Sequence, residues 1–189
     1  MLCSLRNPQK ALPAMFIKLS KEDVHSAQLL GADTVKICEM QGFKPRLEND
    51  KQSREQANVC GYMAEFAVCR LFNLPEPKFN ILSDGGIDLW WNGISIDVKW
   101  TGKECGPLIF DDMDKFRAQI AILVGSTSDH DVMRIYGWVD KLKFRELAEP
   151  HNFGWGERLK LEPHNLYPIE RLWRYMMVKT LSPEDWKER

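Results

Sequence analysis

The hydrophobic and polar positions of the chain first indicate two helices. Ser20 and Asp23 have the spacing of a helix N-terminal capping box, and residues 21–41 follow with a loose helical period that ends at Gly42. Residues 53–72 place alanine, methionine and aromatic side chains at helical spacing, and two prolines follow shortly after. The first part of the chain is therefore predicted to be a helical pair.

Extended stretches dominate the middle of the chain. Strand-like runs lie at about 79–82, 86–91, 94–100, 119–125 and 132–139, with helical runs at about 110–117 and 140–147. This order predicts an α/β fold, an α+β sandwich around a mixed β-sheet of about four or five strands. We expect one domain over residues 15–189, with its core at about 53–140 and a C-terminal extension at 141–189, preceded by a peripheral arm at 1–14.

One segment, residues 85–101, has a register that its turn residues define. Asn92-Gly93 is the favoured pair for a two-residue type I′ turn, which joins strands at 86–91 and 94–100. The turn sets Trp91 opposite Ile94, Trp90 opposite Ser95, Leu89 opposite Ile96 and Asp88 opposite Asp97. One face of the hairpin is then uniformly apolar and predicts core: Ile87, Leu89, Trp91, Ile94, Ile96, Val98 and Trp100. The other face carries Asp88, Trp90, Ser95, Asp97 and Lys99.

The polar face carries the candidate chemistry. Directly opposed residues have Cβ atoms about 4.5–5.5 Å apart, so Asp88 and Asp97 repel each other unless a cation lies between them. Lys99 lies two residues further along the same face and helps to balance this charge. The alternative is a solvated outer face, which is the usual interpretation of an isolated D-x-K. A second D-x-K, at Asp185–Lys187, has no opposing strand and is assigned no function.

A fourth candidate, Glu65, lies within the second predicted helix. The residues three and four positions away on that helix include no basic side chain to pair with it. A carboxylate in such a setting reaches solvent, another partner or a metal ion, so an exposed glutamate at the helix margin stays open as an alternative. Gly61, one turn earlier, is expected to let this helix approach another element closely.

A helix with a glutamate, followed by a hairpin that reads I-D and I-D-V-K, resembles the PD-(D/E)xK nuclease superfamily over residues 53–125. Gly86-Ile87 replaces the proline of that motif. The resemblance implies a restriction-endonuclease-like core in αβββαβ order and a metal-dependent nuclease, with DNA as the expected substrate. It further implies that Asp88, Asp97, Glu65 and the Val98 carbonyl bind one or two Mg²⁺ or Mn²⁺ ions. By the same resemblance, Lys99 assists the attacking water as a catalytic residue beside Asp88, Asp97 and Glu65.

Composition limits the other classes of function. Lysine and arginine total 26 against 27 acidic residues, so any basic surface for nucleic acid must be local. The 5 cysteines include no C-x-x-C pair and the 4 histidines have no zinc-site spacing, so neither zinc nor an iron–sulfur cluster is expected. We expect a soluble protein of a reducing, intracellular setting, without a membrane span.

Two alternatives to an active nuclease stay open. One is a nuclease-fold module that binds nucleic acid or acts as a scaffold without catalysis. The other is an unrelated α/β interaction protein, in which Asp88 and Asp97 lie exposed and far from Glu65. A homodimer also stays open as a partner, and no feature of the sequence identifies its interface.

Overall fold

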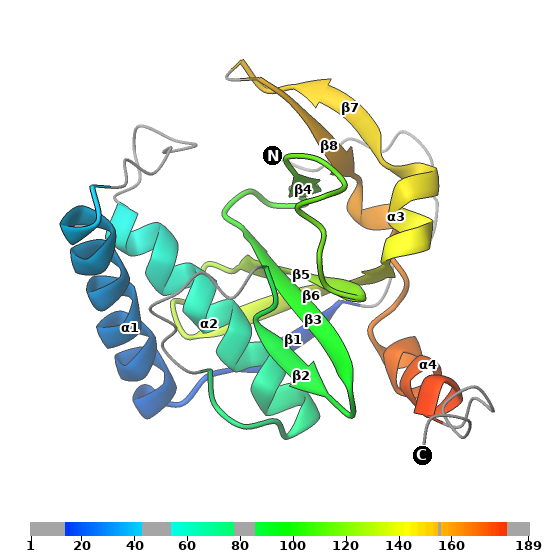
Figure 1. Ribbon diagram of the computed structural model, residues 1–189. Helices are drawn as coiled ribbons and strands as arrows, with labels where there is room; N and C mark the ends of the chain where they lie inside the picture. The colour runs from blue at the N-terminus through cyan, green and yellow to red at the C-terminus, as the bar shows by residue number, and fades with distance from the viewer. Residues whose placement is uncertain (1–13, 43–53, 78–85, 155, 181–189) are drawn as a thin grey trace.

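The computed structural model describes residues 14–42, 54–77, 86–154 and 156–180 (Figure 1). Within them the helices are α1 (Lys21–Met40), α2 (Arg54–Phe72), α3 (Lys141–Leu147) and α4 (Glu170–Thr180), with a short 3₁₀ helix, η1 (Pro163–Asn165). The strands are β1 (Met15–Lys18), β2 (Leu89–Trp91), β3 (Ile94–Thr101), β4 (Leu108–Phe110), β5 (Ile120–Ser126), β6 (Val132–Asp140), β7 (Glu149–Asn152) and β8 (Glu157–Leu161). The expected mixed α/β class is confirmed.

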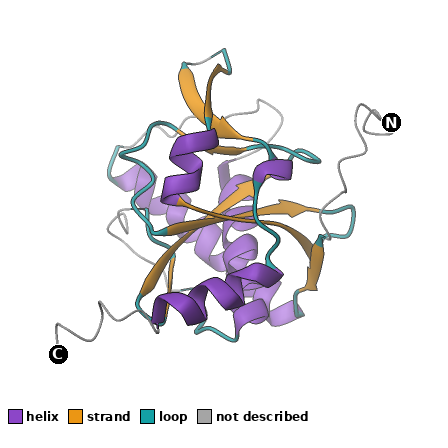
Figure 2. Ribbon diagram, turned by 90° about the vertical axis from the view of Figure 1, so that its right-hand side faces the viewer, coloured by secondary structure: helices purple, strands orange, loops and turns teal. Residues whose placement is uncertain are grey.

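A five-stranded mixed sheet forms the centre, in the order β1-β6-β5-β3-β2. β3 and β5 are parallel, and the other neighbouring pairs are antiparallel. A second sheet of three strands has the order β4-β8-β7, and its β7–β8 hairpin projects from the body in Figure 2. None of the described helices has the length and apolar character needed to cross a membrane.

Apolar side chains fill both faces of the central sheet. On one face, α2 and α4 pack against the sheet through a cluster that includes Phe66, Phe72, Ile96, Ile122 and Leu172. On the other face, β4, β8 and α3 cover a second cluster, which includes Leu108, Phe116, Leu123, Phe144 and Leu161. Both faces of β3 are therefore covered, and a polar side chain in the middle of this strand is surrounded by protein.

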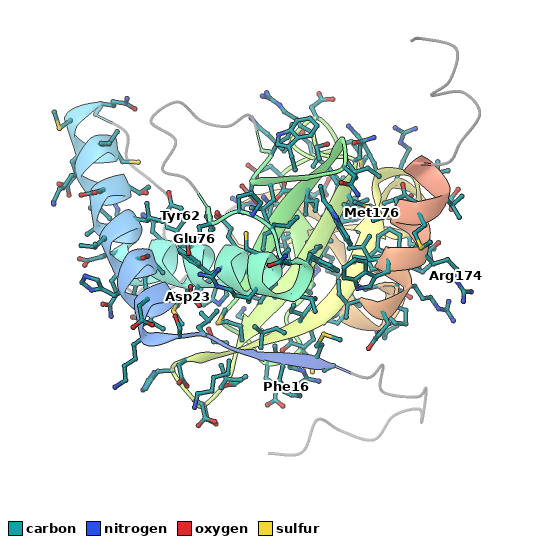
Figure 3. The ribbon with its side chains drawn as sticks, turned by 90° about the horizontal axis from the view of Figure 1, so that it is seen from below. Phe16, Asp23, Tyr62, Glu76, Arg174 and Met176 are labelled. Carbon is teal, nitrogen blue, oxygen red and sulfur yellow. The ribbon has the colours of Figure 1, made fainter. Side chains whose placement is uncertain are left out.

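The start of α1 is tied to the end of α2. The expected capping box is present: the Ser20 hydroxyl accepts a hydrogen bond from the Asp23 amide at 3.0 Å, and the Asp23 carboxylate accepts from the Ser20 amide at 3.1 Å. The same carboxylate, 3% exposed, binds Arg70, which also reaches Glu76 at 2.7 Å (Figure 3). The Arg70 hydrogen bond lowers the pKa of Asp23. This ion-pair network fixes how the two helices lie against each other.

The glycine that lets the helices approach closely is in α1. A Cβ atom at Gly31 would lie 2.6 Å from the Val59 Cγ2 atom and 2.9 Å from the Val59 amide nitrogen. A Cβ atom at Gly61 would meet no described atom within 4 Å. The expectation of a close approach at Gly61 was therefore wrong, because that position of α2 faces away from the elements described here.

The expected helix at 110–117 was also wrong. The first residue of that range ends β4, and turns follow it. Asp112 accepts hydrogen bonds from the amides of Asp114 at 2.8 Å and Lys115 at 3.0 Å. Such local side-chain bonds offer the backbone an alternative to helical pairing. The crossover between parallel strands β3 and β5 is thus a strand and a loop.

The αβββαβ order is not confirmed. The described chain begins with β1, which pairs with β6 at the edge of the sheet, and two helices follow it. The strand expected at 79–82 and residues 1–13 of the expected arm lie outside the described residues. The remaining central elements occur where the pattern placed them, within one residue at each end, except β2, which was expected to start at residue 86 and starts at Leu89.

Candidate active site

The β2–β3 hairpin forms in the expected register. Asn92 and Gly93 have φ values of 48° and 80°, as a type I′ turn requires at both central positions. The observed pairs are Leu89–Ile96, Trp90–Ser95 and Trp91–Ile94. Opposed residues share a face, so Trp90 lies on the same face of the hairpin as Ser95 and, two residues further along β3, Asp97.

The ladder changes just before β2, at Asp88. Regular pairing would place Asp88 opposite Asp97 and let the Val98 amide donate to the Ile87 carbonyl. Instead, the Asp88 amide donates to the Ile96 carbonyl at 2.9 Å, and the Asp88 Oδ2 atom accepts from the Val98 amide at 2.6 Å. The Asp88 carboxylate thus takes the place of a strand carbonyl and is held beside Asp97, bound to the main chain on both sides of it.

This irregularity also corrects the assignment of one side chain. Ile87 was expected on the core face with Leu89, but it packs against the second cluster, on the opposite face of the sheet. A one-residue departure from regular pairing moves the preceding side chain to the other face. The other members of the expected apolar face, from Leu89 to Trp100, belong to or pack against the first cluster.

Asp97 is fully buried at the centre of the site. Its side chain is 0% exposed, and both carboxylate oxygens are inaccessible to solvent. The Lys99 Nζ atom lies 2.5 Å from its Oδ1 atom. A Cβ atom at Gly86 would lie 3.9 Å from its Oδ2 atom, so the small residue before the expected motif leaves room beside the carboxylate.

A loop covers Asp97 on its polar face. The Lys115 carbonyl lies 3.4 Å from the position of a Cβ atom at Gly86, which borders Asp97. Four residues after Lys115, the backbone N–H of Gln119 donates to the Ser95 carbonyl at 3.1 Å and to the Ser95 hydroxyl at 2.9 Å. Residues 115–119 therefore cross from Gly86, next to Asp97, to the β5 side of β3 at Ser95, and this segment is called the covering loop below.

Lys99 connects the buried carboxylate to the surface. Its side chain is 36% exposed, and its Nζ atom lies 5.1 Å from the centre of the Phe110 ring in β4. This cation–π contact orients the ammonium group. Asp88 is half-buried, so the site opens to solvent on the side of Asp88 and Lys99. Sequence reasoning missed Phe110, because it placed that residue in a helix.

Glu65 lies on α2, which packs on the opposite face of the sheet from Asp97 and Lys99. It is half-buried beside Cys69, whose pKa is raised to about 12 by burial, with a further contribution from the Glu65 charge. Among the described residues, no three acidic, histidine or cysteine side chains gather in a group that could hold a metal ion. The structure therefore brings Asp88, Asp97 and Lys99 together, and it does not gather Glu65 with both aspartates in such a group.

The donor set at the hairpin suits one kind of metal ion. Asp88, just before β2, and Asp97, in β3, offer carboxylate oxygens, and oxygen ligands are those that Mg²⁺ and Mn²⁺ prefer. Mg²⁺ usually needs only one or two carboxylates from a protein, since substrate phosphates and water complete its shell. Two neighbouring carboxylates are therefore sufficient for this ion without a third protein ligand.

Comparisons with known proteins identify no family for the chain, so its function is inferred from the site. No protein-family model matches the chain, and neither the curated proteins nor the solved structures compared with it give a significant match.

Proposed function

We propose that the protein is a metal-dependent nuclease of the PD-(D/E)xK type that hydrolyses phosphodiester bonds in DNA. The observation that carries the proposal is the fully buried Asp97 carboxylate in contact with Lys99, with Asp88 fixed beside it. This is the D and D-x-K arrangement on one hairpin that carries the resemblance to the PD-(D/E)xK superfamily. A charged pair inside a sheet is costly to bury, so it needs a reason other than packing.

Each residue has a distinct role in this proposal. Asp88 and Asp97 supply oxygen ligands, and the Val98 amide holds Asp88 in place. Lys99 lies at the solvent side, where its ammonium group donates hydrogen bonds to a phosphate oxygen or orients the attacking water. Phe110 limits the orientations of that ammonium group. A bound Mg²⁺ or Mn²⁺ ion supplies Lewis acidity toward the phosphate and lowers the pKa of water.

A cleavage assay with Mg²⁺ or Mn²⁺ tests the proposal on linear, circular, branched and single-stranded DNA. Asp97→Asn should abolish cleavage and weaken Mn²⁺ binding in calorimetry, because a ligand charge is lost. Lys99→Ala should retain Mn²⁺ binding and slow cleavage by at least about 100-fold, as removal of a single electrostatic donor does elsewhere.

The chain offers a matched control in its second D-x-K. Lys187→Ala removes the lysine of Asp185–Lys187 and should leave cleavage unchanged. The role of Glu65 as a metal ligand and catalytic residue stays a prediction, and Glu65→Gln in the same assay tests it. Wild-type activity in Asp97→Asn would refute the proposed site.

The complete burial of Asp97 favours one second candidate, a nuclease-fold module that binds nucleic acid without cleaving it. The covering loop would then close the site permanently. This candidate predicts that the wild-type protein binds DNA with the same affinity in EDTA and in Mn²⁺ and leaves every substrate intact.

A further inference from the structure

An arginine is held between two aromatic rings on the face of the central sheet that carries the candidate active site. Arg134 lies on β6, and the strand pairing through Gly125 of β5 places it on the same face as Lys99 of β3. Its guanidinium carbon lies 4.7 Å from the centre of the Tyr136 ring and 5.8 Å from the centre of the Phe16 ring. These contacts restrict the orientation of the guanidinium group before any ligand binds.

The Tyr136 ring that supports Arg134 is itself fixed in position. Its hydroxyl accepts a hydrogen bond from the Cys105 backbone N–H at 3.1 Å. A Cβ atom at Gly125 would lie 2.7 Å from the Tyr136 Cε2 atom, so a larger residue there would displace the ring. Tyr136 is buried, whereas Phe16, on the other ring contact of the arginine, is 58% exposed. The two rings therefore hold Arg134 at the boundary between the core and the solvent.

The described residues offer no acceptor for the charge of Arg134. Its Nε atom is inaccessible to solvent and forms no hydrogen bond, and its guanidinium group takes part in no ion pair with a described residue. The nearest acidic residue in sequence, Asp131, has its carboxylate 3.7 Å from the Lys18 ammonium group. A partly buried donor without an acceptor costs free energy, and the planar guanidinium group matches the oxygens of a carboxylate or a phosphate. This part of the protein is therefore suited to an anionic ligand.

We propose that Arg134 binds a backbone phosphate of the nucleic-acid strand whose scissile phosphate lies at Asp97 and Lys99. The proposal deepens the nuclease function and rests on it for the position of the scissile phosphate. Two strand spacings and two residues along the strand separate Lys99 from Arg134, or roughly 12 Å between Cα atoms. About three or four nucleotides of a duplex strand span this distance. Arg134 thus positions the substrate strand, and a phosphate contact of this kind carries no sequence preference.

The test is fluorescence anisotropy with a labelled DNA duplex over a series of salt concentrations, in EDTA so that no strand is cleaved. Arg134→Gln should weaken binding at low salt by roughly tenfold, as loss of a hydrogen bond to a charged group does. It should also reduce the magnitude of the slope of log affinity against log salt concentration by about 0.9, the contribution of one neutralised phosphate. Arg134→Lys keeps the charge and should retain most of the slope. In Mg²⁺, Arg134→Gln should raise KM and leave kcat unchanged, because the contact is equal in the ground and transition states.

The structure provides a matched control in Arg174. This exposed arginine lies on α4, which packs against the opposite face of the sheet, away from Phe16 (Figure 3). Arg174→Gln removes the same charge and should leave the salt slope and KM unchanged. Arg134→Met keeps an apolar side chain between the Tyr136 and Phe16 rings without the charge. It should keep a Tm close to that of wild type and show the salt slope of Arg134→Gln.

The outcomes separate the phosphate site from the nuclease. An equal loss in Arg174→Gln, or a wild-type protein that binds no DNA, would overturn the phosphate site. DNA binding that depends on Arg134 without any cleavage in Mg²⁺ would support a phosphate contact and refute the nuclease. Cleavage by wild type, with the wild-type slope and KM in Arg134→Gln, would overturn the phosphate site and leave the nuclease standing. A large fall in Tm for Arg134→Met and Arg134→Lys, with the salt slope of both unchanged, would assign Arg134 to packing alone.

Discussion

The same substitution in two packed helices is expected to change stability in opposite directions. Gly31→Ala in α1 places a methyl group 2.9 Å from the Val59 amide nitrogen, and this backbone atom cannot rotate away. The helices must separate by several tenths of an ångström, and overpacking of this kind costs about 1–3 kcal/mol. Alanine regains about 1 kcal/mol through its higher helix propensity. The net change is a loss of about 0–2 kcal/mol.

Gly61→Ala in α2 has the same gain in propensity and no steric cost, because its methyl group meets no described atom within 4 Å. It should stabilise the protein by about 1 kcal/mol, or roughly 2–4 °C in Tm for a chain of this size. Thermal unfolding followed by circular dichroism measures both variants. An equal rise in Tm for the two would show that the close contact of α1 and α2 at Gly31 is wrong.

Three further predictions concern other parts of the molecule. Asp23→Asn should cost about 1.5–3 kcal/mol at pH 7, because it removes the charge that Arg70 binds. The pKa of Asp23 is lowered in the folded state, so the stability that its charge contributes is complete above the unfolded pKa of about 3.9 and is lost as the pH falls below that value through the folded pKa. At such low pH, the free energies of unfolding of wild type and variant should converge in urea titrations. The buried Cys69 thiol, with a pKa near 12, should resist iodoacetamide at pH 8 until the protein unfolds, as mass spectrometry would detect. Deletion of the arm at residues 1–14 should leave Tm and cleavage almost unchanged, and a large fall in Tm would show that this segment packs into the core.

The parts of the fold that sequence predicted are those set by local chemistry. The Asn92-Gly93 turn allows one register, and the hairpin follows it over three residue pairs. Ser20 and Asp23 define the start of α1 through bonds within four residues of chain. Strand β7 was missed because all its residues are exposed and no hydrophobic alternation marks it.

The sequence predicted which residues form the candidate site, and it did not predict which segments surround them. Asp97 and Lys99 are close because they share a face of one strand, which alternation requires. The Phe110 ring comes from β4, which pairs with β8 about 50 residues further along the chain, and the covering loop follows β4. The bond from the Val98 amide to Asp88 depends on an irregularity that no turn residue signals. Long-range pairing thus decides how deeply Asp97 is buried.

A last prediction asks whether Asp97 and Lys99 serve the fold or the chemistry. Neighbours on the same face of the sheet, Ala121 and Leu123, are buried and apolar, so an uncharged pair would suit this position. Lys99→Met should destabilise the protein by about 1–3 kcal/mol, less than the loss of a fully buried partner because Lys99 is 36% exposed. The double variant Asp97→Asn/Lys99→Met removes both charges and should recover most of that loss. Urea unfolding of the two variants measures the difference. Recovery of most of the stability without cleavage would mean that the pair contributes little to the fold and is present for chemistry, whereas a double variant as unstable as Lys99→Met would assign it a structural role.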